Sequence, residues 1–192
     1  MKYTNLQHKY TLTIPDNTTV LYCNKNKVVT FIGLLKKKSL KVKLKLFFID
    51  NLMIISNLPN SNKNSINKKE LKMIQGTTLS LIKHILIEIN YKLYQRLKFI
   101  GVGYRAFQVD KPLENQILLK LGYSHVIYFT IPTPIETYNI KYTKLFIFGN
   151  CSYNEITQLA SSIRNCKLPE PYKGKGILYY EEKIKLKKGK KI

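Results

Sequence analysis

A repeated pattern of short motifs limits the folds open to this chain. Thr13-Ile14-Pro15 returns as Thr130-Ile131-Pro132, an offset of 117 residues. The run Val28-Val29-Thr30-Phe31-Ile32-Gly33 is echoed at an offset of 116 residues by Lys144-Leu145-Phe146-Ile147-Phe148-Gly149. Self-similarity at a nearly fixed offset indicates duplicated structural units. We therefore predict two similar units in tandem.

Hydrophobic periodicity predicts the elements of each unit. Residues 41–47 alternate lysine with apolar residues, as a half-buried strand does. Apolar residues spaced by three and four predict a long helix over residues 70–91 and a shorter one over 154–166. Further strands are expected at residues 97–108, 116–122, 128–131, 144–148 and 177–180.

The expected fold class is α+β, with two tandem similar domains, each an antiparallel sheet packed on one helix. The N-terminal domain should span residues 1–94 and contain an Asn-rich loop at 57–69. The C-terminal domain should span residues 95–192 and carry a basic loop and tail.

Charge composition points to a polyanionic partner. The chain has 33 Lys and Arg residues against 11 Asp and Glu, a net charge of +22. Its hydrophobic fraction of 44% is too high for a disordered basic tail, so the charge belongs to a folded protein. Such a charge repels itself, and a nucleic acid is the obvious compensating partner. No stretch is apolar enough to predict a membrane span.

The residues of enzymes and metal sites form weak patterns here. Gly101-Val102-Gly103-Tyr104-Arg105-Ala106 matches a dinucleotide fingerprint, but it continues as a strand pattern where that motif needs a helix. A nucleotide-binding enzyme that uses residues 101–106 is therefore the weaker alternative. Neighbouring Ser124 and His125 would point to opposite faces of a strand, which disfavours a catalytic triad. The scattered histidines and cysteines predict neither a metal site nor a cofactor.

A basic loop near the end of the chain is the most informative segment. Within Pro169–Ile177, two prolines stiffen the loop, and two glycines let the loop backbone approach a partner closely. Lysines supply charge for phosphates, and a tyrosine supplies a stacking surface. The candidate RNA-binding residues are Tyr172, Lys173, Gly174, Lys175 and Gly176, extended by Lys183, Lys185, Lys187, Lys188, Lys190 and Lys191. The alternative for this segment is an ordinary solvated loop. An alternative for the whole protein is a free basic RNA chaperone.

At this loop the chain resembles the bacterial-type large-subunit ribosomal protein L6 family. The resemblance rests on Pro169–Ile177 with the Tyr179-Tyr180-Glu181-Glu182 segment that follows, and it extends over nearly the whole chain. Residues 97–106 are similar to the family's central strand, and residues 119–125 to its next strand. The sequence departs from the family near the end of the long helix, at residues 87–91, and in its Asn-rich loop.

The resemblance implies a structural ribosomal protein with no catalytic activity. It implies binding to large-subunit ribosomal RNA near the sarcin–ricin loop and the stalk base. Neighbouring ribosomal proteins would be partners there, and elongation factors would bind close by. The second domain and the tail would carry most of the RNA contact. No homo-oligomer is expected.

Codon bias and cysteine usage indicate the compartment. Lysine, isoleucine and asparagine are abundant, whereas arginine occurs three times and alanine twice, as an A/T-rich genome would produce. Three cysteines without a close pair indicate a reducing interior. The start, residues 1–15, lacks arginine and resembles no transit peptide. We expect synthesis inside a mitochondrion, with a plastid or a bacterial cytoplasm as the alternative.

Overall fold

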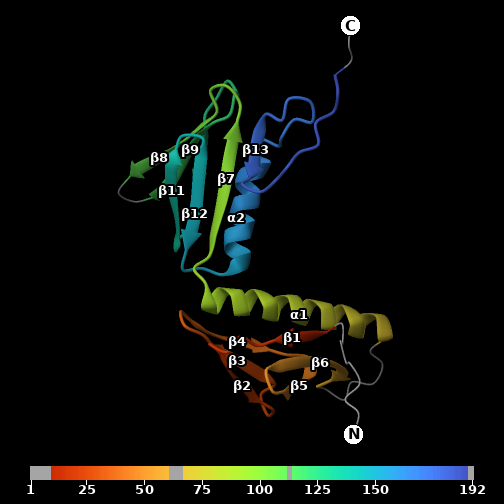
Figure 1. Ribbon diagram of the computed structural model, residues 1–192. Coiled ribbons are helices and arrows are strands. Elements are labelled where there is room, and N and C mark those ends of the chain that lie inside the picture. The colour runs from red at the N-terminus through yellow and green to blue at the C-terminus, as the bar shows by residue number, and fades with distance from the viewer. Residues whose placement is uncertain (1–9, 61–66, 112–113, 190–192) are drawn as a thin grey trace. The chain divides into compact units, whose positions relative to one another are not determined.

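The computed structural model describes residues 10–60, 67–111 and 114–189 (Figure 1). The chain divides into two compact units, residues 1–91 and 92–192, which are treated one at a time below. No helix in the described part of the chain is both long and apolar enough to span a membrane.

The first unit contains two antiparallel three-stranded sheets and one helix. One sheet has the order β1 (Thr11–Thr13), β6 (Leu52–Pro59), β5 (Leu44–Ile49), and the other the order β2 (Thr19–Cys23), β3 (Val28–Ile32), β4 (Lys37–Lys41). Helix α1 (Lys68–Asn90) packs against strands of both sheets. Its residues Ile82, Ile85 and Ile89 join Phe31 and Met53 in one hydrophobic core, which removes apolar surface from water.

The alternating segment 41–47 connects the two sheets instead of forming the single strand that its pattern predicts. Val42, Leu44 and Leu46 are buried and the residues between them are exposed, so the alternation itself is preserved. The strand is interrupted because hydrogen-bond partners change here: the Val42 N–H donates to the Lys27 carbonyl at 2.8 Å, and the Asn60 N–H donates to the Lys43 carbonyl at 2.8 Å. One face of the chain therefore stays on the core while the backbone leaves one sheet for the other.

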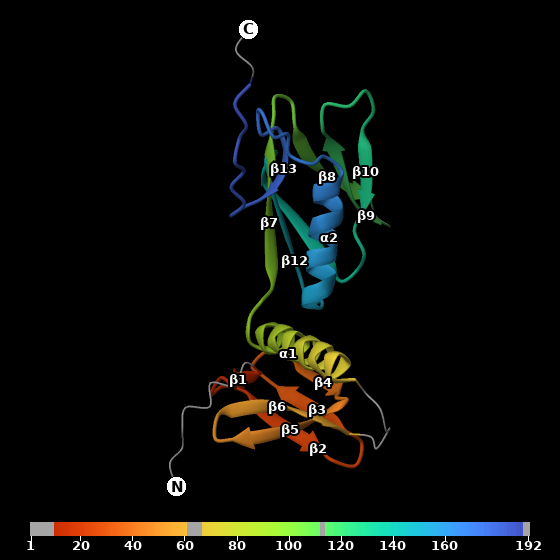
Figure 2. The same ribbon diagram turned by 90° about the vertical axis from the view of Figure 1, so that its right-hand side faces the viewer.

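The second unit contains a four-stranded sheet, a three-stranded sheet and one helix. The larger sheet has the order β11 (Ile135–Lys141), β12 (Lys144–Gly149), β7 (Tyr94–Ile100), β13 (Gly176–Tyr179). The smaller has the order β10 (Ile127–Thr130), β9 (Glu114–Lys120), β8 (Arg105–Lys111). Helix α2 (Tyr153–Asn165) packs along β7, β12 and β13, as Figure 2 shows.

A capping box fixes the start of α2. The Glu155 N–H donates to Ser152 Oγ at 3.3 Å, and the Ser152 N–H donates to Glu155 Oε2 at 2.8 Å, which satisfies N–H groups that the helix itself leaves free. The four positions expected to face the core, Ile156, Leu159, Ala160 and Ile163, are all buried.

The two units repeat one topology in the same chain order. The sheet β1-β6-β5 corresponds to β7-β12-β11, the sheet β2-β3-β4 corresponds to β8-β9-β10, and each helix follows the last strand of its set. Strand β13 is the addition in the second unit. The echo that suggested the duplication nevertheless pairs strands that do not correspond, because Val28–Ile32 is β3 whereas Lys144–Gly149 is β12, the counterpart of β6.

The expected α+β class with antiparallel sheets is confirmed, with corrections to individual elements. Each unit holds two sheets rather than one. The strand expected at 97–108 is two strands, since the chain turns at residues 101–104. Strand β11 was not predicted. The loop expected at 57–69 is shorter, since β6 runs to Pro59 and α1 begins at Lys68; residues 61–66 lie outside the described part.

Candidate RNA-binding surface

The basic loop connects α2 to β13 and is closed by its own backbone. The Glu170 N–H donates to the Lys175 carbonyl at 2.9 Å, and the Gly174 N–H donates back to the Glu170 carbonyl at 2.9 Å. At the base of the loop, the Ile177 N–H donates to the Lys167 carbonyl at 2.9 Å. These bonds fix the loop's shape in the free protein, so little ordering entropy remains to be lost when a partner binds.

The two loop glycines occupy backbone positions that the loop itself requires. Gly174 and Gly176 are both buried. Gly174 has φ +69°, a conformation that residues with a Cβ rarely adopt. A Cβ on Gly176 would lie 2.6 Å from the Cα of Pro169, closer than real Cβ contacts. Both glycines therefore shape the loop, and their contact with RNA stays a prediction.

The loop's charged and aromatic side chains face outward. Tyr172 is 54% exposed, Lys173 is exposed, and Lys175 is half-buried. The chain beyond β13 returns to the loop, where the Lys187 N–H donates to the Pro171 carbonyl at 2.9 Å. The structure thus brings the tail beside the loop. The exposed tail lysines are Lys183, Lys185, Lys187 and Lys188, whereas Lys190 and Lys191 lie outside the described residues.

An ion pair fastens this returning segment to α2. Arg164, in the last turn of α2, donates to both oxygens of Glu182 at 2.6 and 3.0 Å, and the Tyr179 N–H donates to the same carboxylate at 3.1 Å. The hydrogen bond from Arg164, more than any other effect, lowers the pKa of Glu182, and burial opposes it. The same bond raises the pKa of Arg164. The pair holds the basic segment near the loop.

Sequence reasoning missed a second cationic surface, which lies on the face of the four-stranded sheet opposite α2. The Arg96 guanidinium lies over the rings of Tyr94, Phe146 and Tyr180, with its carbon 4.9, 5.0 and 5.3 Å from their centroids. Arg96 alternates along β7 with buried Leu97, so the residue pattern did carry the signal that Arg96 points outward. Its aromatic neighbours come from distant segments, and no local pattern identifies them.

The weaker candidate sites are not supported by the fold. Residues 101–104 form a turn that leads into strand β8, so no helix N-terminus faces the glycines as a bound dinucleotide would need. The ring of His125, the neighbour of Ser124 in the chain, stacks on the ring of Tyr123, with the two centroids 5.6 Å apart. No three His, Cys, Asp or Glu side chains gather into a possible metal site within the described ranges.

Comparison with known proteins identifies the family. Residues 100–180 match the family model of ribosomal protein L6. A large ribosomal subunit protein uL6 from Mycoplasmoides gallisepticum is 35% identical over 183 residues, which cover 93% of this chain and 92% of the relative. A uL6m protein from Reclinomonas americana is 32% identical over 179 residues, with 93% and 94% covered. Another, from Prototheca wickerhamii, is 32% identical over 185 residues, with 93% of each covered.

These relatives confirm two expectations drawn from the sequence. They carry the names of ribosomal proteins, so the prediction that the chain is not an enzyme is confirmed. They also span nearly the whole chain, as the resemblance noted from the motifs does. The chain belongs to the bacterial-type ribosomal protein L6 (uL6) family.

Proposed function

We propose that this protein is a structural constituent of the large ribosomal subunit that binds large-subunit ribosomal RNA through the basic loop and the returning tail. The observation that carries the proposal is the placement of exposed Tyr172 and Lys173 on a loop closed by its own hydrogen bonds, beside the tail lysines. Phosphate contacts by such lysines position a protein on RNA, and an exposed tyrosine can stack on an unpaired base. Lys190 and Lys191 extend the same basic sequence.

The proposed place of binding follows from the family resemblance. It is the RNA near the sarcin–ricin loop and the base of the stalk, where other ribosomal proteins are neighbours and elongation factors bind nearby. One copy per subunit is proposed, without a homo-oligomer. The net charge of +22 supports an RNA-bound state, because phosphates relieve the repulsion among the lysines.

We propose the mitochondrial ribosome as the location. The uL6m relatives of Reclinomonas americana and Prototheca wickerhamii support this assignment, as does the residue bias of an A/T-rich genome. Bacterial uL6 relatives of similar identity keep a bacterial cytoplasm as the alternative, along with a plastid.

Sedimentation of ribosomal subunits from the source cells tests this function. The protein should co-migrate with the large subunit and should dissociate at high salt, because counterion release makes phosphate binding strongly salt-dependent. A free RNA chaperone would instead stay near the top of the gradient. Organelle fractionation before sedimentation tests the location, and recovery of the protein with cytosolic ribosomes would reject the mitochondrial assignment.

A further inference from the structure

Helix α2 covers one face of the larger sheet of the second unit, and the other face is open over β11, β12 and β7 but not at Leu178 of β13, which is 4% exposed. Helix α2 covers the face of Leu97, Leu145 and Ile177, which lie in the hydrophobic core. The strand register places Tyr138, Phe146 and Arg96 side by side in one row on the opposite face, and the Tyr180 N–H extends this row by donating to the Arg96 carbonyl at 3.0 Å. We call this surface the open face; its members are Tyr94, Arg96, Lys98, Tyr138, Lys144, Phe146, Phe148 and Tyr180.

The rings of the open face suit planar groups, and its cations suit anions. Arg96 lies among three rings, and Lys98 Nζ is 4.0 Å from the centroid of Tyr180. The described residues give neither cation an ion-pair partner, and the buried Nε of Arg96 has no hydrogen-bond acceptor among them. Glu136, opposite Phe148 in the register, is the acid at the margin of the face.

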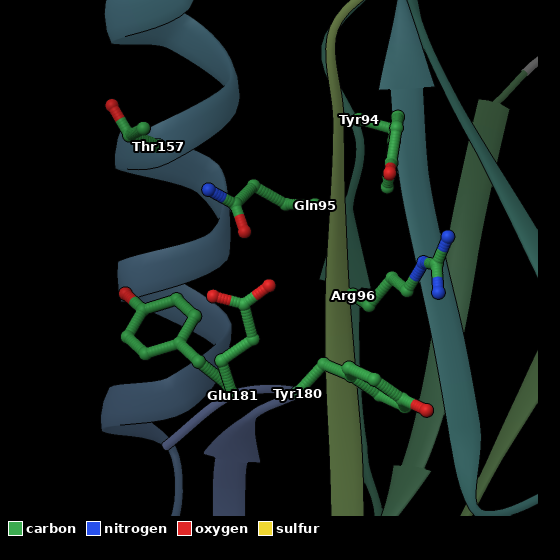
Figure 3. Close-up of a pocket in the computed structure, with 7 residues that line it drawn as sticks. Tyr94, Gln95, Arg96, Thr157, Tyr180 and Glu181 are labelled. Carbon is green, nitrogen blue, oxygen red and sulfur yellow. The ribbon is translucent and has the colours of Figure 1, made fainter.

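A hollow of about 520 Å³ adjoins the open face where β7 extends beyond β13. Tyr94, Arg96 and Tyr180 line it from the open face, whereas Gln95, Thr157, Tyr179 and Glu181 line it from the side of α2. Figure 3 shows Gln95 and Glu181 projecting toward α2, with Arg96 and Tyr180 on the other side of β7. Pockets of this volume hold small planar ligands. The Glu181 carboxylate repels phosphate, so a neutral hydrogen-bonding group suits the hollow and an anion suits the cations of the open face.

We propose that the open face and its hollow bind an unpaired segment of RNA. Bases stack on Tyr94 and Tyr180, phosphates pair with Arg96 and Lys98, and one base enters the hollow, where Gln95 and Glu181 meet its edge. Unpaired bases fit this surface because their faces and edges are free, whereas those of a duplex are stacked and paired. The inference rests on the proposed function in that both require RNA as the partner, but it concerns a separate surface from the basic loop.

Binding of the full-length protein to a fluorescent single-stranded RNA of mixed sequence, about twelve nucleotides long, tests the proposal. Tyr94→Leu and Tyr180→Leu keep apolar bulk but remove the rings. Each should weaken binding by roughly 5- to 100-fold, the range for losing one stacked base. Tyr128→Leu on β10 is the matched control, since Tyr128 is 63% exposed but lies on the other sheet. Its affinity should stay within about twofold of the parent, as for a side chain outside the binding surface.

The following outcomes distinguish failure of this inference from failure of the proposed function. If Tyr94→Leu and Tyr180→Leu fold normally in a thermal melt and bind the single strand as tightly as the Tyr128→Leu control, the open face is not an RNA site, whatever the basic loop does.

In assembled subunits, ultraviolet crosslinks to RNA should appear on Tyr94 or Tyr180 peptides. Chemical crosslinks from these peptides to another protein, without RNA, would overturn the proposal and show a protein occupant. Loss of RNA binding only in a Lys173→Ala, Lys175→Ala variant would support the basic loop alone.

Discussion

Both oxygens of the Glu182 carboxylate accept hydrogen bonds from Arg164, from Nη2 at 2.6 Å and from Nε at 3.0 Å. The two residues are 18 positions apart, and the basic loop and strand β13 lie between them in the chain. The side chains are about a quarter exposed, at 23% and 25%, so solvent screens the pair only in part. This bidentate contact closes the segment that contains the candidate RNA-binding loop, and it couples the loop's position to the end of α2.

Replacing Glu182 with Gln should lower the free energy of unfolding by about 1 kcal/mol at neutral pH, since a partly exposed ion pair contributes that much. The pKa of Glu182 is lowered by folding from its ordinary value of 4.5. The stabilisation is therefore complete above that value and is lost as the pH falls through the lowered pKa. Denaturant unfolding of both proteins between neutral and acidic pH measures the difference. Glu181→Gln, at an exposed neighbour, is the control, and a difference between Glu182→Gln and the parent that persists unchanged into acid would contradict the assignment.

Local patterns predicted the elements whose determinants lie close together in the chain. The apolar face of α2 was predicted from the sequence and forms as expected, whereas the Ser152–Glu155 capping box, also a local pattern, was not among the predictions. Burial of Glu88 on α1 could not be foreseen, because its partner Lys38 is 50 residues away; Lys38 Nζ donates to both carboxylate oxygens at 2.9 Å. The paired contact offsets the cost of burying that carboxylate.

The residues of the candidate site likewise fall into those that the local sequence predicted and those that only the fold brings together. The lysines and Tyr172 were identified from the loop sequence. The role of Gly174 in shaping the loop depends on its positive φ, which the sequence did not reveal. The cluster around Arg96 was missed because its rings come from β7, β12 and the residue after β13, which meet only through the sheet register. Long-range pairing creates that surface.

A double variant, Lys173→Ala with Lys175→Ala, should weaken binding to large-subunit ribosomal RNA by about 1–3 kcal/mol while the thermal melt stays unchanged. The reason is that these side chains are not in the core, and their loss removes phosphate contacts only. Filter binding at several salt concentrations measures both the affinity and its salt slope, which should become shallower. Lys41→Ala with Lys43→Ala is the control, because it removes two lysines at the same spacing in the first unit, where both are exposed. Equal losses in the two double variants would show that charge alone, not the loop, governs binding.

Gly174→Val should distort the loop without removing any charge. A β-branched residue at φ +69° is strained by about 1–3 kcal/mol, and the loop can relieve this strain by changing shape. RNA affinity should therefore fall, although every lysine remains. Gly189→Val is the control, because a Cβ there meets no atom within 4 Å and the backbone is not in the left-handed region. Gly174→Val with parental RNA affinity would show that the loop's conformation is irrelevant to binding.

The second unit alone, produced as residues 92–192, should fold and keep most of the affinity for large-subunit ribosomal RNA. Its hydrophobic core, which includes Leu97, Ile147 and Ile163, shares no residue with the core of the first unit. Removing residues 1–91 therefore takes no residue from the core of the second unit. The basic loop, the Arg164–Glu182 pair and the open face all lie within this fragment. Circular dichroism with a cooperative thermal melt measures folding, and filter binding measures affinity beside the fragment 1–91. Because both fragments are basic, the comparison is made at physiological salt, where non-specific attraction is screened. Equal affinity of the fragment 1–91 would show that RNA binding is not concentrated in the second unit and would overturn the assignment.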